Sequence, residues 1–133
     1  MNKTLRAIAV TLIATLLPSL PAQAHHSFPA QYDAAKPITL KGTITKVEWS
    51  NPHIFIYLDV PDAKTGEVVN WALELGGPNT LLRLGWKRDS LKNGDNITVD
   101  GSLARDGSHL MNAKTIVMDK TGKTMLSGSS GPQ

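Results

Sequence analysis

The strongest constraint on the fold is a strict alternation of apolar and polar side chains in "HIFIYLDV" (53–60). Positions two apart share one face of a β-strand, so the segment predicts a strand with one buried and one outward face. "VVNWALEL" (68–75) repeats the pattern after a turn at 62–67. The predicted inward positions are Ile54, Ile56, Leu58 and Val60 in the first segment and Val69, Trp71, Leu73 and Leu75 in the second.

Strand patterns continue on both sides of these segments. "ITLKGTITKVEW" (38–49) alternates, but its phase slips near Gly42, which predicts a bulge or a strong bend. Two further strands are predicted at "NITVDGSL" (96–103) and "HLMNAKTIVM" (109–118), and "TML" (124–126) would return in a last hairpin.

A short helix is expected between the third and fourth strands. Pro78 suits the first helical position, and Gly85 suits the position after the helix end. Three strands, one helix and two strands predict an all-β fold, a small five-stranded OB-like β-barrel. Another small barrel and an open sandwich are the alternatives that the periodicity leaves open.

The N-terminal segment has the order of a secretory signal peptide. Lys3 and Arg6 precede an apolar run at 7–17, and "AQA" (22–24) forms an A-x-A cleavage site. The apolar run is shorter than the roughly 20 residues that a membrane span needs. The sequence therefore predicts cleavage between Ala24 and His25, a periplasmic or secreted protein, and no membrane span in the mature chain.

The predicted organisation is a signal peptide (1–24), an N-terminal arm (25–37), an OB-like domain (38–126) and a flexible Gly/Ser-rich tail (127–133). The mature 109 residues suffice for one small domain, and their 12 Lys and Arg against 11 Asp and Glu give a net charge of +1. This balance provides no strong positive field for nucleic acid. The absence of cysteine excludes disulfides and thiol chemistry.

Four segments carry a family resemblance that covers nearly all of the predicted mature chain. They are "HHSF" (25–28), 36–60, 70–86 and 94–101. In these segments the chain resembles an uncharacterised family of small exported bacterial proteins, known only as a domain of unknown function. The resemblance implies export and a small β-rich domain, and it implies no established activity. His26, His53, Trp71 and Trp86 fall within these motifs, whereas His109 does not belong to them.

The adjacent histidines suggest a metal site. After the predicted cleavage, His25 would offer its α-amine and its ring nitrogen to one metal ion, with His26 and the outward-facing His53 as further ligands. Tetragonal nitrogen coordination suits Cu(II), which heads the divalent affinity order. The alternative is that His25 and His26 are solvated residues of a loose arm and that His53 hydrogen-bonds a loop.

The outward face of the second strand offers a different hypothesis, a metal-free module that binds an envelope protein or a small ligand. Phe55 and Tyr57 are two residues apart and line one surface with His53. OB-folds often bind ligands on this sheet face. The simpler interpretation is that Phe55 packs under the N-terminal arm, against Phe28, and completes the core.

Catalysis has little support in the sequence. "GGPN" (76–79) is glycine-rich before a helix but lacks the lysine and the length of a phosphate-binding loop. Trp71 and Trp86 are expected in the core rather than in a ligand site. The sequence thus favours a binding module over an enzyme, and a copper oxidase with a histidine brace remains a third hypothesis.

Overall fold

The computed structural model describes residues 27–129 of the 133-residue chain. It contains two short helices and six strands. In chain order they are α2 (Phe28–Gln31), β1 (Tyr32–Glu48), β2 (Phe55–Pro61), β3 (Val68–Glu74), α3 (Pro78–Arg83), β4 (Asn96–Ala104), β5 (Leu110–Met118) and β6 (Thr124–Leu126).

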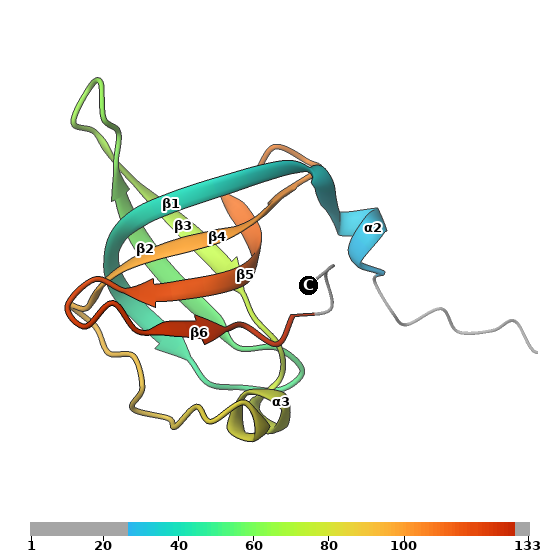
Figure 1. The fold of residues 1–133 in the computed structure, drawn as a ribbon. Helices are drawn as coiled ribbons and strands as arrows, with labels where there is room; N and C mark the ends of the chain where they lie inside the picture. Colours follow the sequence, from blue (N-terminus) through green and yellow to red (C-terminus); the bar gives the residue numbers. More distant parts are fainter. Residues whose placement is uncertain (1–26, 130–133) are drawn as a thin grey trace, which may run out of the picture.

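The strands form one sheet that closes on itself. Their order is β3-β2-β1-β4-β5-β6, and β3 also pairs with β5. The β3–β5 pairing is parallel, and the other pairings are antiparallel. Hydrogen bonds therefore run in a ring through five strands, with α3 at one end of the ring (Figure 1). This arrangement confirms the predicted all-β, OB-like fold with a helix between the third and fourth strands.

β1 is long because it serves two partners. It pairs with β4 from Tyr32 to Thr43 and with β2 from Thr43 to Glu48. The strand bends where it changes partner, and its register with β2 is irregular between Ile44 and Lys46. A Cβ atom on Gly42 would lie 2.2 Å from the backbone oxygen of Asp59, so only glycine fits at this bend. The break in alternation near Gly42 thus predicted a real irregularity.

The apolar faces of the strands enclose one core. The predicted inward residues of the second and third strands are buried or pack against this core, except Val69, which is half-buried near the start of β3. Trp86, predicted in the core, is 3% exposed, and its indole nitrogen donates to the backbone oxygen of Leu126 at 2.9 Å. The fully buried members are Ile44, Ile54, Ile56, Leu58, Leu73, Leu75, Leu81, Ile97, Val99, Met111, Ala113 and Ile116.

Part of the predicted N-terminal arm (25–37) forms regular structure. Residues 28–31 form α2, and residues 32–37 already belong to β1, with Tyr32 paired to Ala104. Tyr32 is 2% exposed, whereas its neighbours at 34–37 are exposed. The sequence pattern missed this first part of β1, since residues 34–37 are all exposed and show no alternation.

The start of the predicted flexible tail is also ordered. The Ser127 side chain is fully buried and donates to the backbone oxygen of Ala113. The Ser127 backbone oxygen accepts from the amide of Gly76 at 2.9 Å. Residues 130–133 and the predicted signal peptide lie outside the described residues.

The two ends of α3 match their sequence signals. Pro78 occupies the start of the helix, and Gly85 follows its end with φ of 87°. The predicted last hairpin is present as β6, which pairs with β5.

Within residues 27–129, no helix is long and apolar enough to cross a membrane.

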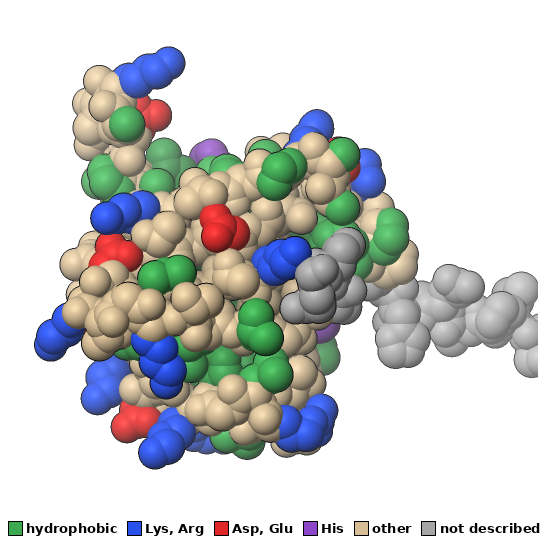
Figure 2. Space-filling model, viewed as in Figure 1, with side chains coloured by type: hydrophobic (Ala, Val, Ile, Leu, Met, Phe, Trp, Pro, Cys, Tyr) green, Lys and Arg blue, Asp and Glu red, His purple; other side chains and the backbone are tan. Residues whose placement is uncertain are grey.

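Charged side chains of both signs are interspersed on the face of the molecule shown in Figure 2. Basic groups lie at the rim and in the lower half, and acidic groups lie among them. No single-sign field covers this face, in keeping with the small net charge expected for the mature chain.

Replacement of Gly42 tests the bend in β1. We expect Gly42→Ala to lower the free energy of unfolding by about 1–3 kcal/mol, because the added methyl group meets the backbone of β2. The neighbouring Lys41→Ala is the control, since its exposed ion pair with Asp119 should change stability by no more than about 0.5 kcal/mol. Denaturant titration measures both values, and equal small losses would contradict the steric role of Gly42.

Candidate functional site

The candidate site is built around a buried carboxylate at the end of β3. Alternation directs Leu73 and Leu75 into the core, so Glu74 between them faces outward. Glu74 is nevertheless only 7% exposed. A buried carboxylate is costly unless it is hydrogen-bonded or paired, so the partners of Glu74 determine how this region folds.

Tyr32 supplies the first partner. Its phenol hydroxyl donates a hydrogen bond to Glu74 Oε2, across 42 residues of sequence. Burial raises the pKa of Tyr32 well above its usual range, and the hydrogen bond and charge of Glu74 raise it further. The phenol therefore stays protonated and remains a donor at neutral pH. The Phe28 ring of α2 packs on Tyr32, with ring centroids 5.6 Å apart.

His53 supplies the second partner. Its Nδ1 lies 3.1 Å from the backbone oxygen of Leu75 and 3.5 Å from Glu74 Oε1. A carbonyl oxygen only accepts, so Nδ1 carries a proton and Nε2 of the neutral ring keeps its lone pair. Nε2 makes no hydrogen bond within residues 27–129, and the side chain is 38% exposed. Carboxylates and carbonyls hold the second nitrogen of metal-ligating histidines in this manner.

The described part of the chain does not contain a complete metal site. Among residues 27–129 no group of three or more His, Asp and Glu side chains is placed to hold a metal ion. His25 and His26, the other predicted ligands, lie outside the described residues. His109 is exposed, and its ring contacts Trp71 in a tilted arrangement, with ring centroids 5.0 Å apart.

Phe55 and Tyr57 occupy the outer face of β2, beside this cluster. Phe55 is in register with Glu74, and both aromatic side chains are half-buried. The Tyr57 hydroxyl donates to Glu48 Oε2 at 3.1 Å, and the Lys46 ammonium lies 5.2 Å from the Tyr57 ring centroid. Phe28 was predicted to pack against Phe55. In the structure its ring contacts Tyr32 instead.

Comparison with known protein families gives one match over most of the chain. Residues 14–112 match a family of unknown function, DUF6152. The chain belongs to this family. DUF6152 carries no assigned activity, and the match includes Tyr32, His53 and Glu74. No curated protein matches the chain.

Sequence reasoning placed His53 at an outward position but missed Tyr32 and Glu74. Tyr32 lay within the segment expected to be an arm, and Glu74 was one of several scattered acids. One signal was available, because Glu74 is the only charged residue in the apolar run "WALELGG" (71–77). Its partner Tyr32 is 42 residues away in the sequence, so their contact could not be predicted from a local pattern.

Removal of the Tyr32 hydroxyl tests the buried pair. We expect Tyr32→Phe to lower the free energy of unfolding by about 1–3 kcal/mol at pH 7, because Glu74 loses its donor. The raised pKa of Tyr32 adds stability below the unfolded-state pKa of about 10, and this contribution is lost as the pH rises above that value. The difference between the two proteins should therefore narrow between pH 9 and 11, measured by denaturant titration.

Tyr57→Phe is the matched control for this experiment. Its hydroxyl also bonds a glutamate, but Tyr57 is half-buried, so its removal should cost less at pH 7. A wild-type advantage over Tyr32→Phe that does not change with pH would contradict the assigned role of the buried phenol.

Proposed function

We propose that the protein is an exported binding module that holds Cu(II) with the mature N-terminal histidine, His53 and His26. The observation that carries the proposal is the orientation of His53. Its Nδ1 is held by Leu75 and Glu74, and its Nε2 lone pair has no partner within residues 27–129. An imidazole fixed through one nitrogen is ready to bind a metal through the other.

The position of α2 supports the contribution of the N-terminus. Contacts run from Phe28 to Tyr32, from Tyr32 to Glu74 and from Glu74 to His53. His26 precedes Phe28 by two residues, and an extended chain spans about 3.3–3.6 Å per residue. The proposal requires that the two histidines at 25 and 26 reach His53 from this side of the sheet.

The ligand chemistry points to copper. The α-amine and ring of His25 close one chelate ring on the metal, and imidazole nitrogens complete the set. Nitrogen-only ligation in a tetragonal arrangement suits Cu(II), and no cysteine is available to favour softer metals. In this role His53 and its buried partners bind and orient the ion, and no catalytic step is required of them.

A Cu(II) titration of protein processed in the periplasm tests the function, with mass spectrometry establishing that the chain starts at His25. We expect tight one-to-one binding that is lost when one extra residue precedes His25, because the chelating amine is then displaced. Equal, weak binding by both proteins would contradict the proposal. Attention would then turn to the alternative, a metal-free module that binds a partner or ligand through Phe55 and Tyr57.

Substitution of single histidines tests the contribution of the folded domain. We expect His53→Asn to weaken Cu(II) binding at least about tenfold, because one nitrogen ligand is lost. His109→Asn is the matched control, since His109 is exposed and its ring contacts Trp71 instead. Equal affinities in the two variants would place His53 outside the metal site.

Acid should release the metal from this site. Imidazole and amine bind Cu(II) only when deprotonated, so the apparent affinity should fall steadily as the pH is lowered from 8 to 5. Isothermal titration in buffers of different ionisation enthalpy would count the protons released. Binding that is independent of pH over this interval would contradict ligation by nitrogen.

A further inference from the structure

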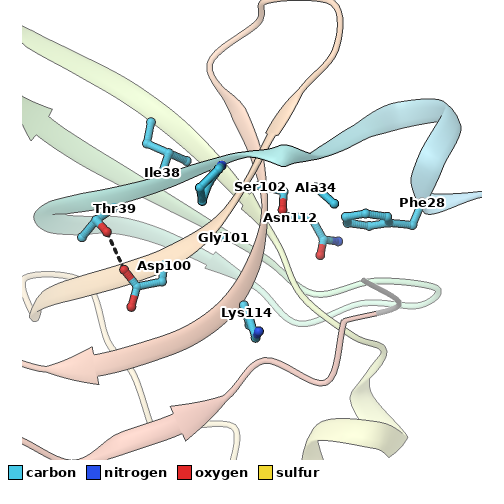
Figure 3. Close-up of a pocket in the computed structure, with 10 residues that line it drawn as sticks. Phe28, Ala34, Ile38, Thr39, Asp100, Gly101, Ser102, Asn112 and Lys114 are labelled. Atoms are coloured by element: carbon cyan, nitrogen blue, oxygen red, sulfur yellow. Dashed lines mark hydrogen bonds between the residues drawn. The ribbon is translucent and has the colours of Figure 1, made fainter. Parts of the chain in front are cut away.

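A break in the pairing of β1 with β4 creates a cavity on the outer face of the sheet. Asp33 pairs with Leu103 and Pro37 with Ser102, so residues 34–36 of β1 have no partners on β4. The cavity beside this detour has a volume of about 440 Å³. Its walls include Phe28, Ala34 and Pro37, and its polar lining includes Ser102, Asn112 and Lys114 (Figure 3).

Asn112 brings an unsatisfied donor to this cavity. The residue is 3% exposed, and its Nδ2 has no hydrogen-bond partner within residues 27–129. Buried amide groups almost always have partners, because an unmet donor loses its hydration without compensation. In Figure 3 the Asn112 amide and the Phe28 ring point toward one another. An aromatic ring is only a weak acceptor, so the donor remains available to a stronger one.

Lys114 brings a positive charge to the same lining. It lies two residues beyond Asn112 on β5, at the irregularity where the register with β4 passes from Ala113 to Thr115, and it lines the same cavity. Lys114 is exposed, and its ammonium has no acidic partner within the described residues. Asp100 also lines the cavity, but its oxygens accept from the hydroxyls of Thr39 at 2.5 Å and Thr115 at 3.2 Å.

We propose that this cavity binds a small monocarboxylate. The carboxylate accepts hydrogen bonds from the Asn112 amide and the Lys114 ammonium, and the apolar body packs against Phe28, Ala34 and Pro37. A few convergent polar groups beside an apolar wall are the usual composition of a small-molecule site. The charge of Asp100 favours one carboxylate over two.

Entry of the ligand requires only a local shift. The Asn112 amide nitrogen is covered, so the half-buried Phe28 ring must move aside for the carboxylate to reach it. Phe28 lies on α2, a helix of four residues, which limits the packing that holds it. The site uses none of the proposed copper ligands, so the two proposals stand or fall separately.

Nuclear magnetic resonance of the full mature protein tests the proposal. The probes are the straight-chain carboxylates from butyrate to octanoate together with benzoate, each matched with the alcohol of the same skeleton. We expect saturable shifts of the Asn112 side-chain amide and of the Ser102 and Lys114 backbone signals with at least one carboxylate. The matched alcohol should bind at least about tenfold more weakly. No response to any carboxylate, or an equal response to the alcohols, would overturn the proposal.

Three substitutions separate binding from folding. Lys114→Gln should weaken the carboxylate at least about fivefold, whereas Lys120→Gln, an exposed lysine outside the cavity lining, should leave its affinity unchanged. Asn112→Leu should abolish binding and leave the unfolding midpoint unchanged or raised, because the unmet donor is removed. Unchanged affinity in Lys114→Gln, or a lowered midpoint in Asn112→Leu, would assign these residues to structure alone.

Asp100→Asn gives a test of opposite sign. Removal of this negative charge should strengthen binding of the carboxylate, because like charges repel across the cavity. Unchanged or weaker binding in this variant would contradict the placement of the carboxylate near Asp100, and the proposed binding mode would then be wrong.

Discussion

The buried Glu74 carboxylate is the interaction on which the outer face of the sheet depends. It needs partners because it lies out of water, and it finds them in Tyr32 from β1 and His53 from the loop before β2. The phenol reaches Glu74 from the first residue of β1, which pairs with Ala104 of β4. The buried carboxylate thus connects the first part of β1 with the histidine ring.

A single row of paired residues connects the two candidate sites. In register across β2, β3, β5, β4 and β1 lie Phe55, Glu74, Asn112, Ser102 and Pro37. Paired residues face the same side of a sheet, so this row lies on the outside of the ring. Glu74 in this row is satisfied by protein partners, and the neighbouring Asn112 is not. Glu74 therefore orients the His53 ring, whereas the Asn112 amide is the donor that we propose for a ligand.

Local patterns predicted most of the fold. Alternation identified β2 and β3 and their inward faces, and Pro78 and Gly85 marked the ends of α3. The first part of β1 was not predicted as a strand, because residues 34–37 are exposed and residues 34–36 do not pair with β4. Of the cluster formed by Tyr32, His53 and Glu74, only His53 was predicted. Tyr32 and Glu74 meet across 42 residues, and Asn112 is buried where β5 pairs with both β3 and β4. Such burial arises from tertiary contacts that no local pattern encodes.

The pairing of β3 with β5, which closes the ring of strands, is short and leaves part of one edge of β5 without β3. Only three residues of β5, Leu110 to Asn112, pair with β3, whereas β1 and β4 share nine register pairs. β6 pairs with the next part of the same edge, from Thr115 to Val117. An uncovered strand edge is a template for pairing with another molecule. The last hairpin therefore covers this stretch of β5 with an edge strand of only three residues, and the amide of Ser127 extends the cover by donating to the backbone oxygen of Lys114.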